Sequence, residues 1–370
     1  MLTVYSDQAK KTEIDGRTRI RSLAFLGDGE YFLAAGDDAV IRQWRLEDGV
    51  EVGEGMKAGG SSVTAMDISG DGKWIVSSGE RVVNVWSATS RQITVTVNGH
   101  SDWVDTVHVS PDSTKFATGS NDKKAFIWNI LTGDRLVGPL EHGDRVGAVR
   151  FSPDGDRIVT GTASKGLRIY SAHNGELLRT IPVSVASYPR VVTWFTPQSI
   201  IALVSHNTLM HIDVNTGQTF SSWTLPGGVP VNNFGPIAWG SIALPSNGRF
   251  IVSFIGRSIS LWDSYTFARI SSDFRHPSNI WTITLSPDCN YLAITDWDKK
   301  ITLRNLNNTI SSYYLTSERV VEQPPNMCGN DPQVQIEALR GQLRSLELHF
   351  GSFFGNPVFV ELKRQLRRVE

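Results

Sequence analysis

The side chains that could carry chemistry are few and scattered along the chain. The 370 residues include eight histidines and only two cysteines, Cys289 and Cys328. His206 and His211 are five apart, but they fall on an expected turn and the strand after it rather than on one helix face. Structural zinc sites need four ligands at defined spacings. The sequence therefore predicts no metal site and no cofactor.

Two short patterns resemble sites but have simpler explanations. Ser120 and Lys123 match the S-x-x-K spacing of some acyl enzymes, which requires a helix start beneath the serine. Here the serine falls in a turn between two expected strands. Asp296 and Asp298 flank Trp297, and two carboxylates are few for calcium. No nucleotide-binding loop or hydrolase elbow occurs either, so we expect no catalytic residues and no enzyme activity.

An internal repeat is the dominant pattern. The stretches 69–86, 110–128 and 152–170 each read as strand, polar turn, strand, tight turn, strand, with an aromatic residue closing the third strand. The closing position recurs at intervals of 42, 42, 42, 42, 50 and 42 residues, at Trp44, Trp86, Trp128, Tyr170, Ile212, Trp262 and Arg304. Seven copies at this spacing match a propeller blade of about 40–45 residues.

Alternating apolar residues support this interpretation. They occur in period-2 sets, which place apolar side chains on one face of a strand: Val104, Val107, Val109; Val146, Val149, Phe151; Ile280, Ile283, Leu285. One four-stranded sheet cannot bury both of its faces, whereas radially packed sheets can. Over residues 1–316 the chain resembles the WD-repeat family. The resemblance implies an all-β, seven-bladed propeller of four-stranded antiparallel blades.

The resemblance also implies a hydrogen-bonded tetrad of His, Ser or Thr, Asp and Trp inside a blade. The third copy is the best match, with His100, Thr118 or Ser120, Asp122 and Trp128. We assign the structural tetrad to His100, Thr118, Asp122 and Trp128. The turn aspartate recurs at Asp38 and Asp298, and a histidine recurs at His142 and His276. Blades with an incomplete tetrad are expected to be looser rather than absent.

The two ends of the propeller must meet to close the ring. The stretch before the first copy aligns with the outer strand and loop that precede the third copy. We therefore predict that residues around Lys11 to Ile14 form the outer strand of the last blade. The competing candidate is Ser311 to Leu315.

A binding face follows from the family's geometry, in which the start of each inner strand and the residue before the turn aspartate reach one rim. The third copy places Trp103, Asp105 and Asn121 there, and the fourth places Arg145. The same register adds further residues from the first and last copies: Arg19, Arg21 and Asp37; Asn279, Trp281 and Trp297. Tryptophan and arginine dominate interface hot spots, so a peptide or loop with acidic and apolar residues is the expected ligand.

After the propeller the pattern changes. Residues 317–332 are predicted to be a linker, and residues 225–236 a protruding loop, from their proline and glycine content. Apolar residues at helical spacing predict a helical tail over 333–370. The tail could dock on the propeller, fold with a partner or self-associate. Its basic end could be a solvated face or contact RNA or acidic lipid. Because the apolar pattern continues to Glu370, the sequence is a candidate fragment of a longer protein.

Composition limits the remaining function classes. The formal net charge is -1, which gives no bulk electrostatic reason to bind nucleic acid or membrane. No signal-peptide core or membrane-length apolar run occurs, so a cytoplasmic or nuclear protein is expected. We predict a non-enzymatic scaffold for protein–protein interaction. The alternatives are a sensor or ligand-binding module of a multidomain signalling protein, and a propeller enzyme that uses the central channel.

Overall fold

The computed structural model describes residues 11–315, except 163–165, 184–191, 205–207, 225–239, 246–247, 265, 272–273 and 308. The predicted linker (317–332), helical tail (333–370) and protruding loop (225–236) lie outside the described residues.

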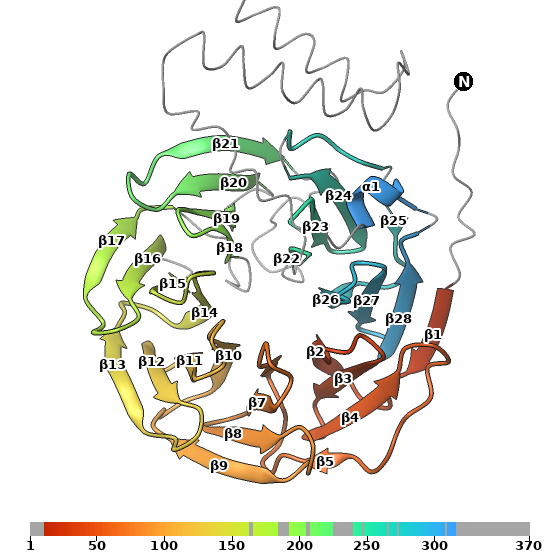
Figure 1. Ribbon diagram of the computed structural model, residues 1–370, viewed down its shortest axis with the longest axis horizontal. Helices are drawn as coiled ribbons and strands as arrows, with labels where there is room; N and C mark the ends of the chain where they lie inside the picture. Colours follow the sequence, from red (N-terminus) through yellow and green to blue (C-terminus); the bar gives the residue numbers. More distant parts are fainter. Residues whose placement is uncertain are drawn as a thin grey trace, which may run out of the picture.

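Seven four-stranded antiparallel sheets surround a central axis, as the repeat predicted (Figure 1). Blades 1 to 6 each take four consecutive strands, running from the centre of the ring outward. Blade 7 takes its three inner strands from the end of the propeller and its outer strand from the N-terminal part of the chain. The prediction of a seven-bladed propeller is confirmed.

The strands follow one another with little helix between them. Blades 1 and 2 contain β2 (Ile20–Phe25), β3 (Tyr31–Gly36), β4 (Val40–Arg45), β5 (Met56–Lys57), β6 (Ala65–Ile68), β7 (Trp74–Ser78), β8 (Val82–Ser87) and β9 (Ile93–Asn98). Blades 3 and 4 contain β10 (Val104–Val109), β11 (Lys115–Ser120), β12 (Lys124–Asn129), β13 (Arg135–Glu141), β14 (Val146–Phe151), β15 (Arg157–Thr162), β16 (Gly166–Ser171) and β17 (Leu177–Ile181). Blades 5 and 6 contain β18 (Val192–Thr196), β19 (Ser199–Val204), β20 (Thr208–Asp213), β21 (Thr219–Thr224), β22 (Gly240–Ala243), β23 (Phe250–Ile255), β24 (Ser258–Asp263) and β25 (Phe274–Arg275). Blade 7 contains β26 (Ile280–Leu285), β27 (Tyr291–Asp296), β28 (Lys300–Asn305) and β1 (Lys11–Asp15).

The turns give the disc two distinct faces. Because neighbouring strands are antiparallel, the turns between second and third strands share one face with the connections between blades. We call this the upper face, and the opposite one, with the turns between first and second and between third and fourth strands, the lower face. Several lower-face turns repeat one bond. In blade 3, for example, Ser110 Oγ donates to Asp112 Oδ1 at 2.5 Å.

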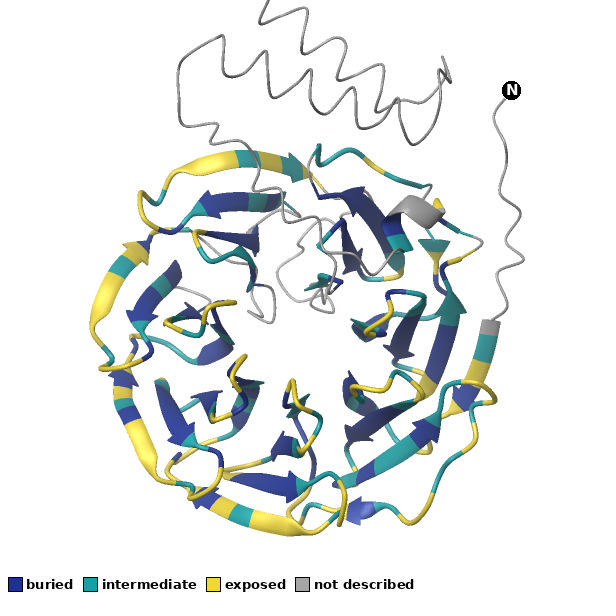
Figure 2. Cartoon of the chain, in the orientation of Figure 1, coloured by how far each residue is buried: buried dark blue, intermediate teal, exposed yellow. Residues whose placement is uncertain are grey.

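The apolar core lies between neighbouring blades rather than within each one. Seven buried clusters occur, and each joins two adjacent sheets. Between blades 2 and 3, for instance, Val76 and Val85 pack with Phe116 and Trp128. Figure 2 shows the buried residues on the inner strands and the exposed ones concentrated on the outer strands. Every blade is therefore stabilised by both neighbours, which makes closure of the ring essential.

The repeat position occupies the same place in every blade. The third-strand residue pairs across the sheet with a buried apolar residue of the second strand, as Trp128 does with Phe116 and Arg304 with Leu292. The blade that contains Ile212 follows the same register, with Ile212 opposite Ile200. The sequence spacing thus predicted the correct phase even where the aromatic residue is missing.

The N-terminal strand closes the ring, as predicted. Strand β1 pairs antiparallel with β28 from Lys11↔Arg304 to Asp15↔Lys300. Ile14 is buried and packs with Ile301 and Leu303 in the cluster between blades 7 and 1. The competing segment forms the short helix α1 (Ser312–Leu315) instead. The Tyr314 hydroxyl of this helix donates to Asp263 Oδ2 of blade 6 at 3.0 Å.

Candidate functional site

The predicted tetrad residues of blade 3 form one continuous hydrogen-bonded chain. His100 Nδ1 lies 2.9 Å from Asp122 Oδ2, and His100 Nε2 lies 2.8 Å from Thr118 Oγ1. Trp128 Nε1 donates to the same Thr118 oxygen at 2.9 Å. The alternative Ser120 bonds elsewhere, to the Asp102 carbonyl. The chain joins the connection between blades 2 and 3 to the second and third strands of blade 3.

Burial shapes the protonation states in this chain. It lowers the pKa of His100, and the Asp122 carboxylate only partly offsets that effect. Burial also acts to raise the pKa of Asp122, but hydrogen bonds from the Ser101 amide and His100 outweigh it, so the pKa falls below its usual value. A buried, fully bonded histidine of this kind is a structural partner rather than a free ligand.

Other blades keep only parts of the tetrad. Trp86 Nε1 donates to Ser77 Oγ in blade 2, and Trp262 Nε1 donates to Ser253 Oγ in blade 6, both at 2.9 Å. In blade 1 the equivalent of these serines is Ala34, as the strand register shows. Among the described residues, Trp44 Nε1 consequently has no hydrogen-bond partner. The blades nevertheless pack alike, so the polar chain supplements the apolar core.

Blade 7 corrects the expected role of Asp298. This aspartate occupies the turn position but is exposed, whereas His276 Nε2 lies 2.9 Å from Asp296 Oδ2. The residue equivalent to Thr118 is Ile294 in this blade, so this position offers the histidine no hydroxyl. The buried carboxylate at the end of β27 takes that place. The turn residue Asp38 of blade 1 pairs with Arg42.

The predicted rim residues share one backbone geometry on the upper face. In blades 1, 3 and 7 the residue before the turn aspartate donates its amide to the carbonyl of the residue before the inner strand. These bonds are 3.1, 2.9 and 3.0 Å long and run from Asp37 to Arg19, from Asn121 to Trp103 and from Trp297 to Asn279. The alignment therefore placed these pairs in equivalent positions.

Five of the predicted residues form one cluster where blade 7 meets blade 1, which we call the ring-junction cluster: Arg19, Arg21, Asp37, Trp281 and Trp297. The two indole rings are 6.0 Å apart between centroids. The Arg19 guanidinium lies over both rings, at 5.7 and 5.9 Å from their centroids. Arg21 lies over Trp281 at 5.4 Å and hydrogen-bonds to Asp37 through its Nε atom.

Trp281 departs from the prediction in one respect. The expected rim position implied an accessible indole, but Trp281 is only 6% exposed. Arg19 and Arg21 lie over its ring, and blade 1 packs beside it. Arg19 and Asp37 are more open, with side chains 42% and 35% exposed. Trp281 therefore packs beneath the two arginines, and Arg19 is the residue of this group that is accessible to a ligand.

Asn279 directly precedes β26 of blade 7, and the other four predicted residues lie on the blades across the ring. Trp103, Asp105 and Asn121 belong to blade 3, and Arg145 belongs to the start of blade 4. All four are half-buried. The structure thus places the predicted residues in two groups, one at the ring junction and one on blades 3 and 4, with blade 2 between blades 1 and 3.

The inner strands of blades 2, 3 and 4 carry a row of titratable residues that sequence reasoning did not single out. Asp67 Oδ2 accepts the Val109 amide at 2.7 Å, and His108 Nδ1 accepts the Phe151 amide at 3.1 Å. Each side chain therefore bonds to the inner strand of the next blade. Arg150, third in the row, donates to Thr106 Oγ1 at 3.3 Å.

The electrostatics of this row favour a structural role. Burial lowers the pKa of His108 to about 3, and Arg150 adds to the effect. Burial raises the pKa of Asp67, although Arg150 partly opposes it. A general base works best with a pKa near the operating pH, so His108 is poorly suited to proton abstraction at neutral pH. In the described part of the chain, no group of three or more His, Cys, Asp or Glu side chains could hold a metal ion.

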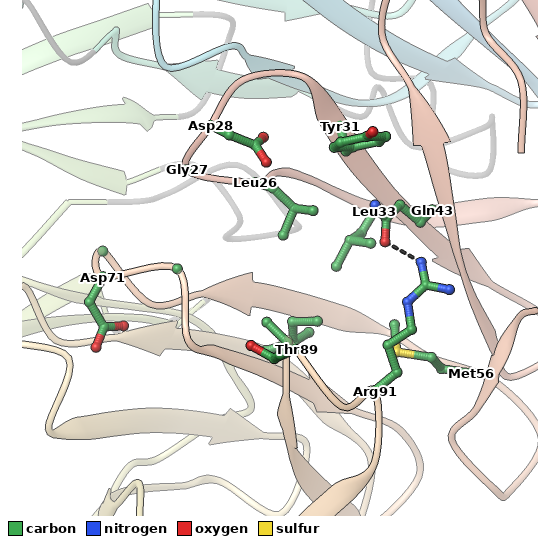
Figure 3. A pocket seen from close by; sticks show the side chains of 14 residues that line it. Leu26, Gly27, Asp28, Tyr31, Leu33, Gln43, Met56, Asp71, Thr89 and Arg91 are labelled. Carbon is green, nitrogen blue, oxygen red and sulfur yellow. Dashed lines mark hydrogen bonds between the residues drawn. The ribbon is translucent and has the colours of Figure 1, made fainter. Parts of the chain in front are cut away.

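A cavity of about 450 Å³ on the lower face was also missed. It lies between blades 1 and 2, and Arg91 forms one wall (Figure 3). The signal was present in the repeat: positions 49, 133, 175 and 217 are glycine, and position 91, at the same spacing, is arginine. A large charged residue where four copies have glycine marks a local change in packing.

Comparison with known families agrees with this architecture. The model of the WD domain, G-beta repeat, matches residues 9–45, 55–87, 91–129, 135–171 and 269–305. The first match begins before β1, so each sequence repeat starts with the outer strand of the preceding blade and ends with the third strand of its own. No curated protein matches the chain. No described helix is long and apolar enough to cross a membrane.

The matched ranges leave out residues 172–268, which contain blade 5 and the three inner strands of blade 6. Those blades nevertheless have the four-stranded topology of the matched ones. Five matched repeats, seven blades of one register and a ring closed by the first strand lead to one conclusion: the chain belongs to the WD-repeat family.

Proposed function

We propose that this protein is a non-enzymatic scaffold that binds a peptide or loop of a partner protein on its upper face. WD-repeat propellers are generally protein-interaction scaffolds. The observation that carries the proposal is the ring-junction cluster, in which an accessible arginine is held on two tryptophan rings. Arginine and tryptophan are the residue types that contribute most to protein interfaces.

The charges of the cluster favour an acidic ligand. Arg19 and Arg21 both face the Asp37 carboxylate, and Arg21 holds it more closely. Arg19 lies 3.9 Å from the nearest Asp37 oxygen, so its guanidinium retains the capacity to bind a second carboxylate. The indoles hold the guanidinium in place and reduce the entropy lost on binding. An aspartate or glutamate with apolar neighbours fits this surface best.

Trp103 and Arg145 extend the proposed surface to blades 3 and 4. A ligand that reaches both groups would cross the mouth of the central channel. The proposal therefore includes ten residues of one face: Arg19, Arg21, Asp37, Trp103, Asp105, Asn121, Arg145, Asn279, Trp281 and Trp297.

The test starts with affinity capture by the intact chain and identification of the bound partner. Its affinity is then measured by calorimetry for Arg19→Ala, Trp103→Ala and Arg145→Ala. Each change should weaken binding about fivefold or more while the unfolding temperature stays nearly unchanged. Arg45→Ala is the matched control, because Arg45 is similarly exposed (43%) but lies beside a lower-face turn. Unchanged affinity in all three upper-face variants would contradict the proposal.

The helical tail remains part of the proposal as a site of self-association. The prediction concerns residues 333–370, which lie outside the described residues. Sedimentation of the intact chain and of a variant that ends at residue 332 tests it. Equal masses per chain for the two proteins would remove self-association from the proposal.

A further inference from the structure

The cavity between blades 1 and 2 has an apolar floor and a polar rim. Leu33, Ile75 and Met56 line it and are themselves buried, at 1%, 2% and 6% exposed. Figure 3 shows Asp28 and Asp71 at one side and Arg91 at the other. The volume of about 450 Å³ falls within the range of about 300–1,000 Å³ that small-ligand sites occupy. One large apolar side chain and the backbone next to it would fit.

The outer strand of blade 1, which borders the cavity, is short, as is β25 of blade 6. Strand β5 has two residues, whereas the outer strands of blades 2 to 5 have five to seven. Where the outer strand is long, the lower-face turn of the next blade packs closely against it. A Cβ added at Gly133 or Gly175 would lie 2.6 or 2.7 Å from a valine of the preceding blade. Between blades 1 and 2 the Arg91 side chain crosses this space to Gln43 and Val52, and the cavity remains beside it.

Arg91 occupies a turn position that is glycine in blades 1, 3, 4 and 5 and Phe267 in blade 6. Its φ is 58°, in the left-handed region, where Gly49, Gly133, Gly175 and Gly217 have 69 to 77°. This conformation is strained for a residue with a Cβ.

The charge of Arg91 is not neutralised within the described residues. Its Nη2 atom donates to the Gln43 side-chain oxygen and to the Val52 carbonyl, the latter at 3.1 Å, and both acceptors are neutral. The described chain gives it no carboxylate partner. A half-buried guanidinium of this kind binds a carboxylate strongly, because the hydrogen bonds are charge-assisted.

The opposite rim limits how many acidic groups a ligand can carry. Asp28 accepts the Glu30 amide at 2.9 Å, and Asp71 accepts Ser69 Oγ at 2.6 Å, so turn bonds hold both carboxylates in place. Lys73 pairs with Asp71 and offsets part of its charge. Near these carboxylates a second acidic group would be repelled.

We propose that this cavity docks a partner peptide through one large apolar side chain and one adjacent acidic residue. The apolar side chain fills the space above Leu33, Met56 and Ile75, and the carboxylate pairs with Arg91. This lower-face site is separate from the proposed upper-face surface, and neither depends on the other.

The experiment uses the full chain and capped peptides with one leucine followed by one glutamate, titrated by calorimetry to millimolar concentration. Replacing the glutamate by glutamine should weaken binding about tenfold or more, and replacing the leucine by alanine should also weaken it. The Arg91→Gly variant introduces the residue found at this position in blades 1, 3, 4 and 5, so it should fold normally and lose the same affinity. The same titrations are repeated in the Arg19→Ala background, where the upper-face surface is weakened, and Arg91→Gly should cause the same loss there, which separates this test from that of the upper face. Arg45→Ala, a lower-face change outside the cavity, should leave the peptide affinity unchanged.

Gln43→Ala distinguishes docking from a purely structural role. It removes a neutral partner of Arg91 and leaves the charge, so the glutamate peptide should still bind. The proposal is overturned by equal binding of the glutamate and glutamine peptides, by undiminished binding to Arg91→Gly, or by no binding at about 5 mM. Tighter binding of a lysine version would also overturn it, since the rim aspartates would then dominate recognition.

Discussion

Blade 3 and blade 7 each hold a buried histidine against a carboxylate, but they connect it differently. In blade 3, hydrogen bonds run from Asp122 through His100 and Thr118 to Trp128. This polar chain joins the connection that holds His100 to the second and third strands of the blade. In blade 7, His276 contacts Asp296, and the positions of the threonine and tryptophan hold Ile294 and Arg304.

The difference shows that the polar chain is one of several ways to stabilise a blade. Both blades keep the same apolar register, and blade 7 adds two features that blade 3 lacks. Its outer strand, β1, comes from the N-terminal part of the chain rather than from the adjacent sequence, and the ring-junction cluster joins its rim to blade 1. A blade without the full tetrad can thus be secured by its neighbours, because the core lies between blades.

Removing strand β1 is expected to have the largest effect. A chain that begins at residue 16 loses the buried Ile14 and exposes the edge of β28, so the free energy of unfolding should fall by at least about 3 kcal/mol. Thermal unfolding followed by circular dichroism measures the loss. A chain that begins at residue 10 keeps the strand and is the matched control. Equal unfolding temperatures for the two truncated chains would mean that blade 7 is stable without its outer strand.

The next largest effect is the expected difference in stability between variants of the two turn aspartates, Asp122 and Asp298. Asp122→Ala leaves His100 and the Ser101 amide without their acceptor and should cost roughly 1–3 kcal/mol. Asp298→Ala should change stability by less than about 0.5 kcal/mol, because this side chain is exposed. Asp296→Ala should resemble Asp122→Ala. Urea unfolding of the three variants ranks them, and a large effect at Asp298 would reject the assignment of Asp296 as the histidine's partner.

A third buried histidine, His142 of blade 4, has no carboxylate among its hydrogen-bond partners in the described chain, and the pH dependence of stability tests its role. His142 contacts Thr160 and the Leu140 carbonyl, and burial lowers its pKa to about 4 from a usual value of 6.5. Its contribution is complete above about pH 6.5 and is lost as the pH falls toward 4, because the unfolded chain then binds a proton that the folded chain does not. At pH 5 the loss is about 2 kcal/mol.

Between pH 6 and 4.5 the unfolding free energy of His142→Gln should depend less steeply on pH. The change in slope should correspond to about one proton fewer taken up on unfolding. Denaturant unfolding at several pH values measures the slope. His173→Gln is the control, because that histidine is exposed, with a side chain 62% accessible. If the two variants show the same slope, the low pKa of His142 is wrong.

The smallest expected effect is a gain in blade 1. Ala34→Ser places a hydroxyl where Ser77 and Ser253 accept a tryptophan N–H in blades 2 and 6, and so gives Trp44 Nε1 a partner. Stability should rise by about 0.5–1 kcal/mol. Ala35→Ser, one residue along the strand and on its other face, buries an unpaired hydroxyl and should be destabilising. A loss of stability in Ala34→Ser as well would show that this site has no room for the bond.

The fold could be predicted from the sequence because the repeat spacing reflects the length of one blade. The spacing located every third strand, including those ending near Ile212 and Arg304, since a fixed length of chain is needed for four strands and their turns. Closure by residues near Lys11 followed from the same alignment.

The site was less predictable because side-chain depth depends on neighbouring blades. Nothing in the local pattern at Trp281 shows that Arg19 and Arg21, more than 250 residues away, lie over its ring. The role of Asp296 depended on Ile294 not supplying a hydroxyl. The cavity lies beside the short strand β5, whose length is an outcome of pairing rather than of composition.

Strand β1 also determines when the protein can be finished during synthesis. Its partner β28 begins at residue 300, so the first strand leaves the ribosome long before the edge it completes exists. Joining ends separated by nearly 290 residues costs roughly 5 kcal/mol of chain entropy. That cost is recovered only when blades 7 and 1 pack together. Until then the edge of the final sheet is open to pairing with another chain, and the growing chain depends on the speed of the last step to avoid aggregation.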